Sequence, residues 1–242
     1  MLGDGAHGEG HATTIFVPKS IDTSNVKNIF ADWNGKEATE KYSVAFGNYS
    51  HVEGQNNIAL GHRAHAEGWM TAAEGWASHA EGKNTYAVGY ESHAEGLGTK
   101  TEGEGAHAEG NTTVASGNYS HAEGEKTEAN SYGSHAEGEK SKTEGKFAHA
   151  EGGSTKAYGD YSHAEGHQTV AKGKESHAEG ESSKECPDSL VKVDENGNAP
   201  AAINLYNDWS GKGAGDKYCV AFGDYSHVEG QNSIAFGSRS HA

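Results

Sequence analysis

Small and polar residues alternate along most of this chain with a short, strict period. The motif His-[Ala/Val]-Glu-Gly returns every 14 residues through the middle of the sequence. Its histidines are His51, His65, His79, His93, His107, His121, His135, His149, His163 and His177. The motif returns at His227, one further step leads to His241, and an isolated variant begins at His7. A fixed period of this kind indicates a repeat fold whose units pack on their neighbours.

Each 14-residue unit consists of two similar halves of seven residues. In the unit that begins at His79, Ala80 is matched by Ala87 and Gly82 by Gly89. Each half predicts one short strand and one tight turn, because glycine adopts backbone conformations that other residues avoid. We therefore predict an all-β fold, a β-solenoid or β-roll whose 14-residue coils have two strands each. A coiled coil is excluded because its regular glycines would each cost about 1 kcal/mol relative to alanine.

Successive side chains of a strand point to opposite faces, which assigns every position to the inside or outside of the coil. In Ser-His-Ala-Glu-Gly, the small residues are predicted inside and the His and Glu outside. In the other half, threonine and alanine are predicted inside, which makes an internal hydroxyl ladder and not the outward array of an ice-binding surface. The residues of this threonine column are Thr71, Thr85, Thr99, Thr113 and Thr127.

The outward residues vary in one half of the coil and hardly at all in the other. Tyr86 and Val88 in one coil become Lys100 and Glu102 in the next, whereas His and Glu return in every complete copy. We predict that the His and Glu columns face a second copy of the chain, with a homotrimer favoured and a dimer left open. The predicted interface consists of His51, Glu53, His65, Glu67, His79, Glu81, His93, Glu95, His107, Glu109, His121, Glu123, His135, Glu137, His149, Glu151, His163, Glu165, His177 and Glu179.

The same columns are the only candidates for ion chemistry that the pattern offers. Imidazoles from several chains meeting at an axis could hold a divalent ion or chloride. This ion ladder would consist of His65, His79, His93, His107, His121, His135, His149 and His163. The simpler interpretation, which we favour, is that each His bonds to a Glu, with no metal or other cofactor. No catalytic residue is predicted, because a catalytic site is normally one constellation in a cleft.

Composition restricts the partners of the chain. With 33% apolar residues and a net charge of -16, the chain is not expected to bind nucleic acid. No segment approaches the roughly 20 apolar residues that insert in a membrane, and no signal peptide is visible. Exposed aromatic residues could contact a protein or glycan receptor, although ordinary surface aromatics are the favoured interpretation. These are Trp69, Trp76, Tyr86, Tyr90, Tyr119 and Tyr161.

Residues 43–68, SVAFGNYSHVEGQNNIALGHRAHAEG, resemble the YadA-like head repeats of trimeric autotransporter adhesins. The resemblance covers about residues 43–186 and 217–242. It implies a left-handed parallel β-roll that is trimeric and adheres to host surfaces or matrix. The signal peptide, coiled-coil stalk and membrane barrel of that family are not seen here. Similar SHAEG-rich repeats occur in phage tail-fibre-like proteins and other bacterial surface proteins.

The two ends of the repeat region contain a duplication. Residues 28–66 match residues 204–242 at 26 of 39 positions. The two segments are not separated by a whole number of 14-residue coils. We predict an N-terminal cap with the first cassette over 1–42, a β-roll over 43–183, an insertion with the second cassette over 184–216, and the start of a second β-roll over 217–242. The insertion is expected to contain a strand at Leu190–Val193 and a turn at Asn196-Gly197.

Near both cassettes, the outward positions of the variable half become apolar. We expect the cassettes to fold back over these positions and to cap the exposed edges of the sheets. The residues concerned are Val44, Phe46, Ile58, Leu60, Val220, Phe222, Ile234 and Phe236.

Taken together, these patterns predict a non-enzymatic module. We expect an adhesive head or fibre segment at a cell surface or on a virion, with itself and a host-surface protein or glycan as partners. A passive spacer in a tail fibre or surface appendage is the alternative, and the identity of any receptor is not predicted.

Overall fold

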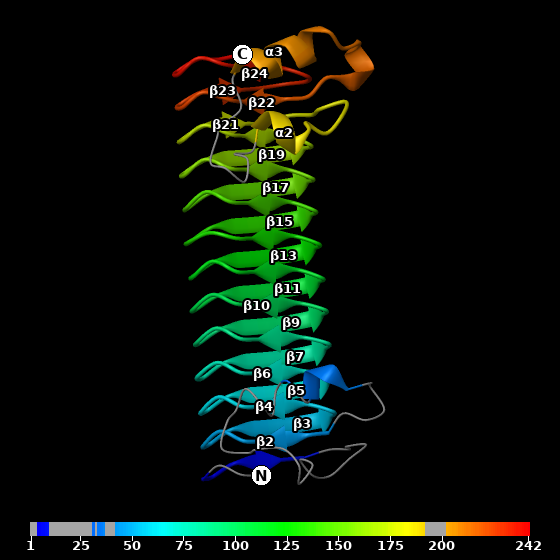
Figure 1. Cartoon of the computed structure of the whole chain (residues 1–242), viewed down its shortest axis with the longest axis vertical. Coiled ribbons are helices and arrows are strands. Elements are labelled where there is room, and N and C mark those ends of the chain that lie inside the picture. Colours follow the sequence, from blue (N-terminus) through cyan, green and yellow to red (C-terminus); the bar gives the residue numbers. More distant parts are fainter. Residues whose placement is uncertain (1–3, 10–30, 32, 37–41, 192–201) are drawn as a thin grey trace. The chain divides into compact units, whose positions relative to one another are not determined.

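The computed structural model describes residues 4–9, 31, 33–36, 42–191 and 202–242. The chain divides into two compact units, Met1–Tyr119 and Ser120–Ala242, and each is described by itself. Both units are parallel β-solenoids built from two-stranded coils with a 14-residue spacing, which confirms the predicted all-β coil (Figure 1).

Unit 1, residues 1–119, contains two parallel sheets that stack along the unit. The sheet that holds the repeated His and Glu residues is called the His–Glu sheet. Its strands are β1 His7–Gly8, β3 His51–Gln55, β5 His65–Trp69, β7 His79–Lys83, β9 His93–Leu97 and β11 His107–Asn111. The second sheet has shorter strands, which are β2 Val44–Ala45, β4 Ile58–Ala59, β6 Ala72–Ala73, β8 Tyr86–Ala87, β10 Lys100–Thr101 and β12 Val114–Ala115.

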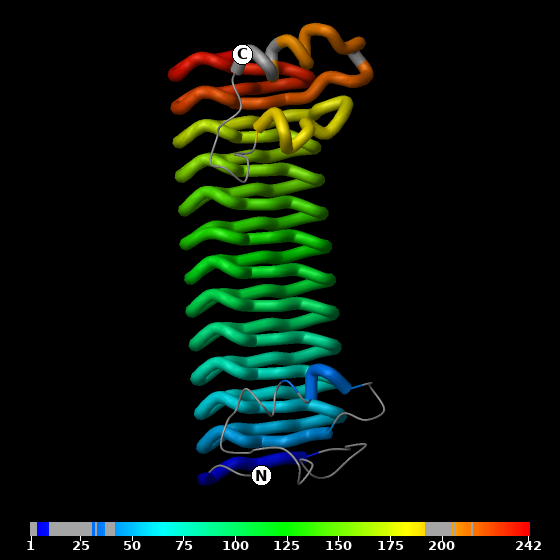
Figure 2. Tube along the Cα trace, in the orientation of Figure 1, coloured from blue at the N-terminus to red at the C-terminus, as the bar shows by residue number. Residues whose placement is uncertain are grey.

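Unit 2, residues 120–242, repeats this arrangement. Its His–Glu sheet consists of β13 His121–Glu125, β15 His135–Glu139, β17 His149–Gly153, β19 His163–His167, β21 His177–Ala178 and β23 His227–Val228. Its second sheet consists of β14 Glu128–Ala129, β16 Lys142–Thr143, β18 Lys156–Ala157, β20 Val170–Ala171, β22 Val220–Ala221 and β24 Ile234–Ala235. Between β21 and β22 lie two helices and a 3-10 turn, α2 Asp188–Val191, α3 Ala202–Ser210 and η1 Ala214–Asp216. The regular rise of the coils within each unit can be followed along the trace in Figure 2.

The pairing register places equivalent residues of consecutive coils directly over one another. In unit 1, for example, His65 pairs with His79, Ala66 with Ala80 and Glu67 with Glu81. The inside of each coil is therefore a set of columns of small residues, and alanines such as Ala80 and Ala87 have no exposed surface. This confirms the predicted division into inward small residues and outward His and Glu.

Hydroxyl groups inside the coil are bonded mostly to the backbone. Ser78 Oγ donates to the Gly75 carbonyl at 2.8 Å, and the same contact recurs from Ser92 to Gly89. The threonine column is buried, as predicted. Thr113 and Thr127 donate to glutamate carbonyls of their own coil at 3.1 Å, whereas the Oγ1 atoms of Thr71, Thr85 and Thr99 have no hydrogen-bond partner among the described residues. These bonds satisfy polar groups that would be costly to bury unpaired.

Two columns of glycine allow consecutive coils to approach closely. A Cβ added at Gly89 would lie 1.9 Å from the carbonyl oxygen of Gly103. At Gly82, where φ is +101°, a Cβ would lie 2.3 Å from the oxygen of Gly96. Any larger residue at these positions would push the coils apart, because the obstructing atoms belong to the backbone.

In the turns, the residue two positions before each histidine has a left-handed backbone conformation. This residue is Arg63 in one coil, Ala77 in the next and Glu91 in the third, all with φ between 53° and 59°. Its backbone N–H donates to a carbonyl of the preceding coil, as in the bond from Ala77 to His62 at 2.8 Å. The hydrogen bond between coils offsets the strain of the left-handed conformation.

The structure corrects two of the predicted boundaries. The isolated motif at His7 is already part of the stack, because β1 pairs with β3 and His7 is aligned with His51. In unit 2, His177 pairs with His227 and Val170 with Val220. Residues 217–242 therefore continue the same solenoid and do not start a second one. In both units, the cassette is an insertion between two coils that stack directly.

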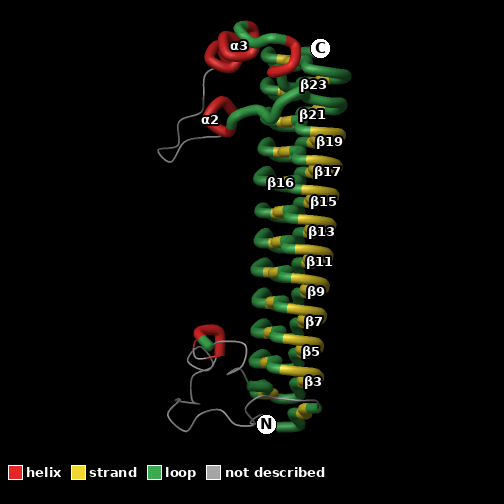
Figure 3. Tube along the Cα trace, turned by 90° about the vertical axis from the view of Figure 1, so that its right-hand side faces the viewer, coloured by secondary structure: helices red, strands yellow, loops and turns green. Residues whose placement is uncertain are grey.

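The cassettes cover the second sheet, as expected. In unit 1, Trp33 packs with Tyr42 against Ile58 and Leu60, and its Nε1 donates to the Tyr42 carbonyl at 3.0 Å. In unit 2, the bond from Trp209 Nε1 to the Tyr218 carbonyl has the same length. Figure 3 shows α2 and α3 on the side of unit 2 opposite to the His–Glu sheet. In both units, the cassette thus leaves the His–Glu sheet uncovered by any described residue.

The predicted strand in the second insertion is wrong where it can be checked. Leu190 and Val191 belong to the helical turn α2, and Val191 packs on Val170 and Val220 of the second sheet. Burial of one side of a short helix explains this apolar pair as well as a strand would. Lys192, Val193 and the predicted turn at Asn196-Gly197 lie outside the described residues, as do most of residues 10–41.

Replacing Gly89 by alanine should lower the free energy of unfolding by about 3 kcal/mol or more, because the added Cβ meets backbone that cannot move aside. The matched control is Gly98→Asn, at a turn with φ of +68° and its nearest contact at 3.6 Å. Asn84 occupies the equivalent position of the preceding coil. We expect the control to change stability by less than about 0.5 kcal/mol. Urea denaturation followed by circular dichroism measures both, and equal stability of the two variants would contradict the close-approach argument.

Candidate functional site

The histidines of the His–Glu sheet form stacked columns. In unit 1, the rings of His65 and His79 have centroids 4.7 Å apart and planes 2° from parallel. In unit 2, the rings of His149 and His163 are 4.8 Å apart and parallel. The separation is that of neighbouring strands in a sheet, so the in-register pairing of the strands sets it. His7 is tilted by 52° against His51 at the N-terminal end of unit 1.

Each glutamate of the sheet lies between two histidines. In unit 1, Glu67 places its two carboxylate oxygens 3.7 Å from His65 Nε2 and 3.6 Å from His79 Nε2. In unit 2, Glu137 lies 3.8 Å from both His135 Nε2 and His149 Nε2. These distances exceed those of good hydrogen bonds, so the contacts are electrostatic.

The imidazole Nε2 atoms are shielded from solvent although their side chains are about one third exposed. His79 and His149, for example, have exposed side-chain fractions of 33% and 36%. Neither Nε2 atom has accessible surface or a hydrogen-bond partner among the described residues. The columns thus present ring edges and carboxyl groups at the surface, with the Nε2 atoms of rings such as His79 and His149 turned away from solvent.

Carboxyl groups stacked in a column share protons. Hydrogen bonds with Glu123 and Glu151 raise the pKa of Glu137 to about 7. The same kind of bond, from Glu137 and Glu165, lowers the pKa of Glu151. In turn, Glu179 and Glu151 raise the pKa of Glu165 to about 7. Glu137 and Glu165 are therefore harder to ionise than Glu151, which stands between them, because adjacent like charges at strand spacing repel one another.

Stacking and burial disfavour protonation of some of the imidazoles. Burial lowers the pKa of His79, and the neighbouring imidazoles of His93 and His65 lower it further. The pKa of His149 is lowered by burial and by His135 and His163 in the same way. The neutral ring is therefore favoured at His79 in unit 1 and at His149 in unit 2.

The geometry within one chain disfavours an ion held by two neighbouring imidazoles of the same column, and the predicted ion ladder between chains stays a prediction. His149, Glu151 and His163 are one of several groups whose potential ligand atoms lie within 4.8 Å of one another. A zinc ion binds imidazole nitrogen at about 2.1 Å, so two nitrogens on one ion lie at most about 4.2 Å apart. Rings that stack in parallel at 4.8 Å would have to tilt before both could bind the same ion.

The stacking of a group of surface aromatics in unit 2 was not predicted from the sequence. Phe147 and Tyr161 stack at 5.3 Å, and Tyr132 meets Phe147 edge-on at 5.3 Å. Phe147 and Tyr161 both stand two residues before a repeat histidine, a spacing that could have revealed them. Of the predicted aromatics, Tyr90, Tyr119 and Tyr161 are more than half exposed, whereas Tyr86 is half-buried.

Comparison with protein families identifies the repeat. The sequence model of the YadA head domain repeat matches residues 38–64, 80–99 and 220–240. These segments are YadA head repeats. The YadA head is a structural adhesin domain that is exposed at the surface, and the family is not one of enzymes. A comparison with curated proteins found no match for the chain. Among the described residues, no helix has the length and apolar character needed to cross a membrane.

Replacing Glu137 by glutamine tests the repulsion between neighbouring groups of the carboxyl column. A carboxyl whose pKa rises from 4.5 to about 7 on folding destabilises the folded state as the pH rises through that window. Since glutamine stays neutral, Glu137→Gln should melt at a higher temperature than the parent at pH 8, and the difference should shrink toward pH 4.5.

The control for this experiment is Glu139→Gln, on the same strand. A hydrogen bond with Lys140 lowers the pKa of Glu139, so its replacement should bring no gain at pH 8. If Glu137→Gln melted at or below the parent temperature at pH 8, the carboxyls would not repel one another as described.

Proposed function

We propose that this chain is a non-enzymatic adhesive head or fibre module that assembles as a homotrimer through the His–Glu sheets. The observation that carries this proposal is the difference between the two faces of each unit. The cassettes pack on the second sheet, whereas the His–Glu sheet repeats the same outward pair in each of its described coils. The left-handed winding that the family resemblance implies is part of the proposal.

A second copy of the chain is the partner that best fits this face. YadA-type heads form trimers, which is the first support. The second is complementarity, since stacked imidazoles and a column of carboxyl groups recur at one spacing and can match the same columns of another copy coil by coil.

Association would also add stability that the single chain lacks. The inside of the coil is filled mainly by alanine, serine and threonine, so each coil buries little apolar area. Burying the His–Glu sheets of several copies against one another would shield the imidazole stems and couple folding to assembly.

The outer surface is left for attachment. In a trimer closed by the His–Glu sheets, the variable outward residues and the exposed turn aromatics of both units would face a host cell or receptor. Location at a cell surface or on a virion follows from this role. The second candidate, a passive spacer that sets the length of a fibre, is favoured by the uniform coils of each unit.

Light scattering coupled to size exclusion tests the assembly. We expect a mass near three times the 25.4 kDa of the chain. The double variant His93→Arg, His107→Arg places two long charged side chains on the His–Glu sheet beside the glutamates, and it should be monomeric. The control Val114→Arg, on the second sheet, should remain trimeric. A folded monomeric parent would contradict the proposed interface.

Deleting two whole coils, residues 121–148, distinguishes an adhesive module from a spacer. The deletion restores the repeat register, because Ser120 is then followed by His149. Beads coated with the parent or the shortened chain are counted on cultured epithelial cells. An adhesive outer face predicts fewer bound beads for the shortened chain, since part of its contact surface is gone. Equal binding of both would favour the spacer.

A further inference from the structure

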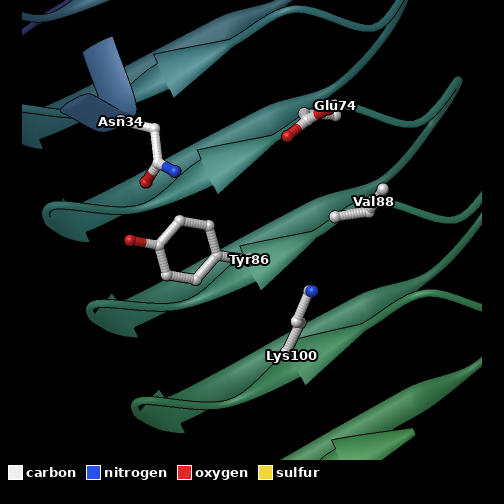
Figure 4. Close-up of a pocket in the computed structure, with 5 residues that line it drawn as sticks. All are labelled: Asn34, Glu74, Tyr86, Val88 and Lys100. Atoms are coloured by element: carbon white, nitrogen blue, oxygen red, sulfur yellow. The ribbon is translucent and has the colours of Figure 1, made fainter. Parts of the chain in front are cut away.

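A cleft opens in unit 1 between its cassette and the second sheet. It has a volume of about 360 Å³ and is lined by Asn34, Glu74, Tyr86, Val88 and Lys100. In Figure 4, Asn34 and Glu74 lie on one side of the Tyr86 ring and Lys100 lies on the other. The volume is at the small end of the range of ligand pockets, and suits one compact molecule.

The described residues of the cassette pack mainly on the coils that precede the cleft. Trp33 packs on Ile58, Leu60 and Ala72, and its ring lies 6.4 Å from that of Tyr86 between centroids, with the two planes 71° apart. Ala72 is the smallest outward residue near this contact, so space remains beside it. Asn34, the next residue of the helical turn, lines that space from the side of the cassette (Figure 4).

Glu74 is the unusual residue of the cleft. Its Oε1 atom is buried and has no hydrogen-bond partner among the described residues. Burial raises the pKa of Glu74 to about 7, against the opposing charge of Lys100. A buried carboxyl oxygen that accepts no hydrogen bond is costly unless a ligand donates to it.

The other coils show that this state is specific to Glu74. Glu102 occupies the equivalent outward position two coils later and lies 2.5 Å from Lys100 Nζ. In unit 2, Glu144 occupies it again and lies 3.4 Å from Lys142 Nζ. Each of these two glutamates has a lysine partner two residues before it, whereas Glu74 has Ala72 at that position.

The remaining groups define what the cleft can bind. Tyr86 donates its hydroxyl to Asn84 Oδ1 at 3.2 Å, which fixes the ring as a half-buried platform. The carboxyl of Glu74 accepts hydrogen bonds, the ammonium group of Lys100 donates them, and the amide of Asn34 does both. Lys100 lies close enough to Glu74 for its charge to lower the pKa of that carboxyl, so the charges of the cleft offset each other and favour a neutral ligand, and the net charge of -16 repels an anion.

We propose that this cleft binds a neutral pyranose sugar, such as a terminal hexose of a cell-surface glycan. A pyranose has an apolar C–H face for the Tyr86 ring and hydroxyls that can donate to Glu74 and accept from Lys100. The inference supplies a ligand class for the adhesive function proposed above and rests on it, although sugar binding is measurable by itself.

Saturation-transfer NMR on the full chain tests the proposal with the methyl glycosides of glucose, galactose, mannose and N-acetylglucosamine. At least one of them should receive saturation from the protein. Glu74→Gln should weaken its binding about tenfold, because a charge-assisted hydrogen bond is lost. Val88→Trp should abolish binding by filling the cleft. The controls Glu144→Gln and Tyr161→Ala, which lie outside the cleft, should bind as the parent does.

Sialic acid and glucosamine serve as the anionic and cationic probes, and neither should bind. The proposal is overturned if no neutral glycoside binds, if binding survives both Glu74→Gln and Val88→Trp, or if only a charged probe binds. Bead attachment of the same variants separates the two proposals. Intact attachment without sugar binding would reject the sugar site alone, and sugar binding by beads that never attach to cells would reject the adhesive role alone.

Discussion

The close approach of consecutive coils at their glycines is the constraint on which the rest of each unit depends. At Gly89 and Gly82, the space that a Cβ would need is occupied by the backbone of the next coil. With the coils held this close, the strands pair in register and every residue stands over its equivalent. A packed core of alanine then follows, because only small side chains fit inside such a thin coil.

Stacking of equivalents also has an electrical consequence. A fold that repeats the same residue at strand spacing must place like groups side by side, which ordinary globular domains avoid. In the His–Glu sheet, the conflict is relieved by neutral imidazoles and by carboxyls that share protons, as at Glu137 and Glu151. Each raised carboxyl pKa and each lowered imidazole pKa removes charge from this surface, and this makes it more suitable for burial against another copy than its composition suggests.

Much of the fold could be predicted because a period of this kind leaves few alternatives. The coil length, the inward alanines and the outward His and Glu all follow from glycine and alternation. The boundaries were harder to predict. An insertion separates His7 from His51 and another separates His177 from His227, and the sequence does not indicate whether coils stack across such a gap. The helical turn at Leu190 was missed because a short apolar run fits a helix and a strand equally well.

The candidate sites divide in the same way. Columns can be predicted, because they repeat, whereas the cleft at Glu74 depends on one coil having Ala72 and on where a distant tryptophan packs. Such a site arises from a local departure from the repeat, so a search for periodicity passes over it.

At the rim of the coil, the residue two positions before each histidine keeps a left-handed backbone conformation whatever its side chain. Arginine, alanine, glutamate, glycine, tyrosine and phenylalanine all occupy this position with nearly the same φ. The conformation is held by a main-chain bond to the coil below, which is indifferent to the side chain. Single substitutions at this position can therefore change the chemistry of the surface while the backbone stays the same. A protein built in this way can vary the surface that it presents to partners without a change of fold.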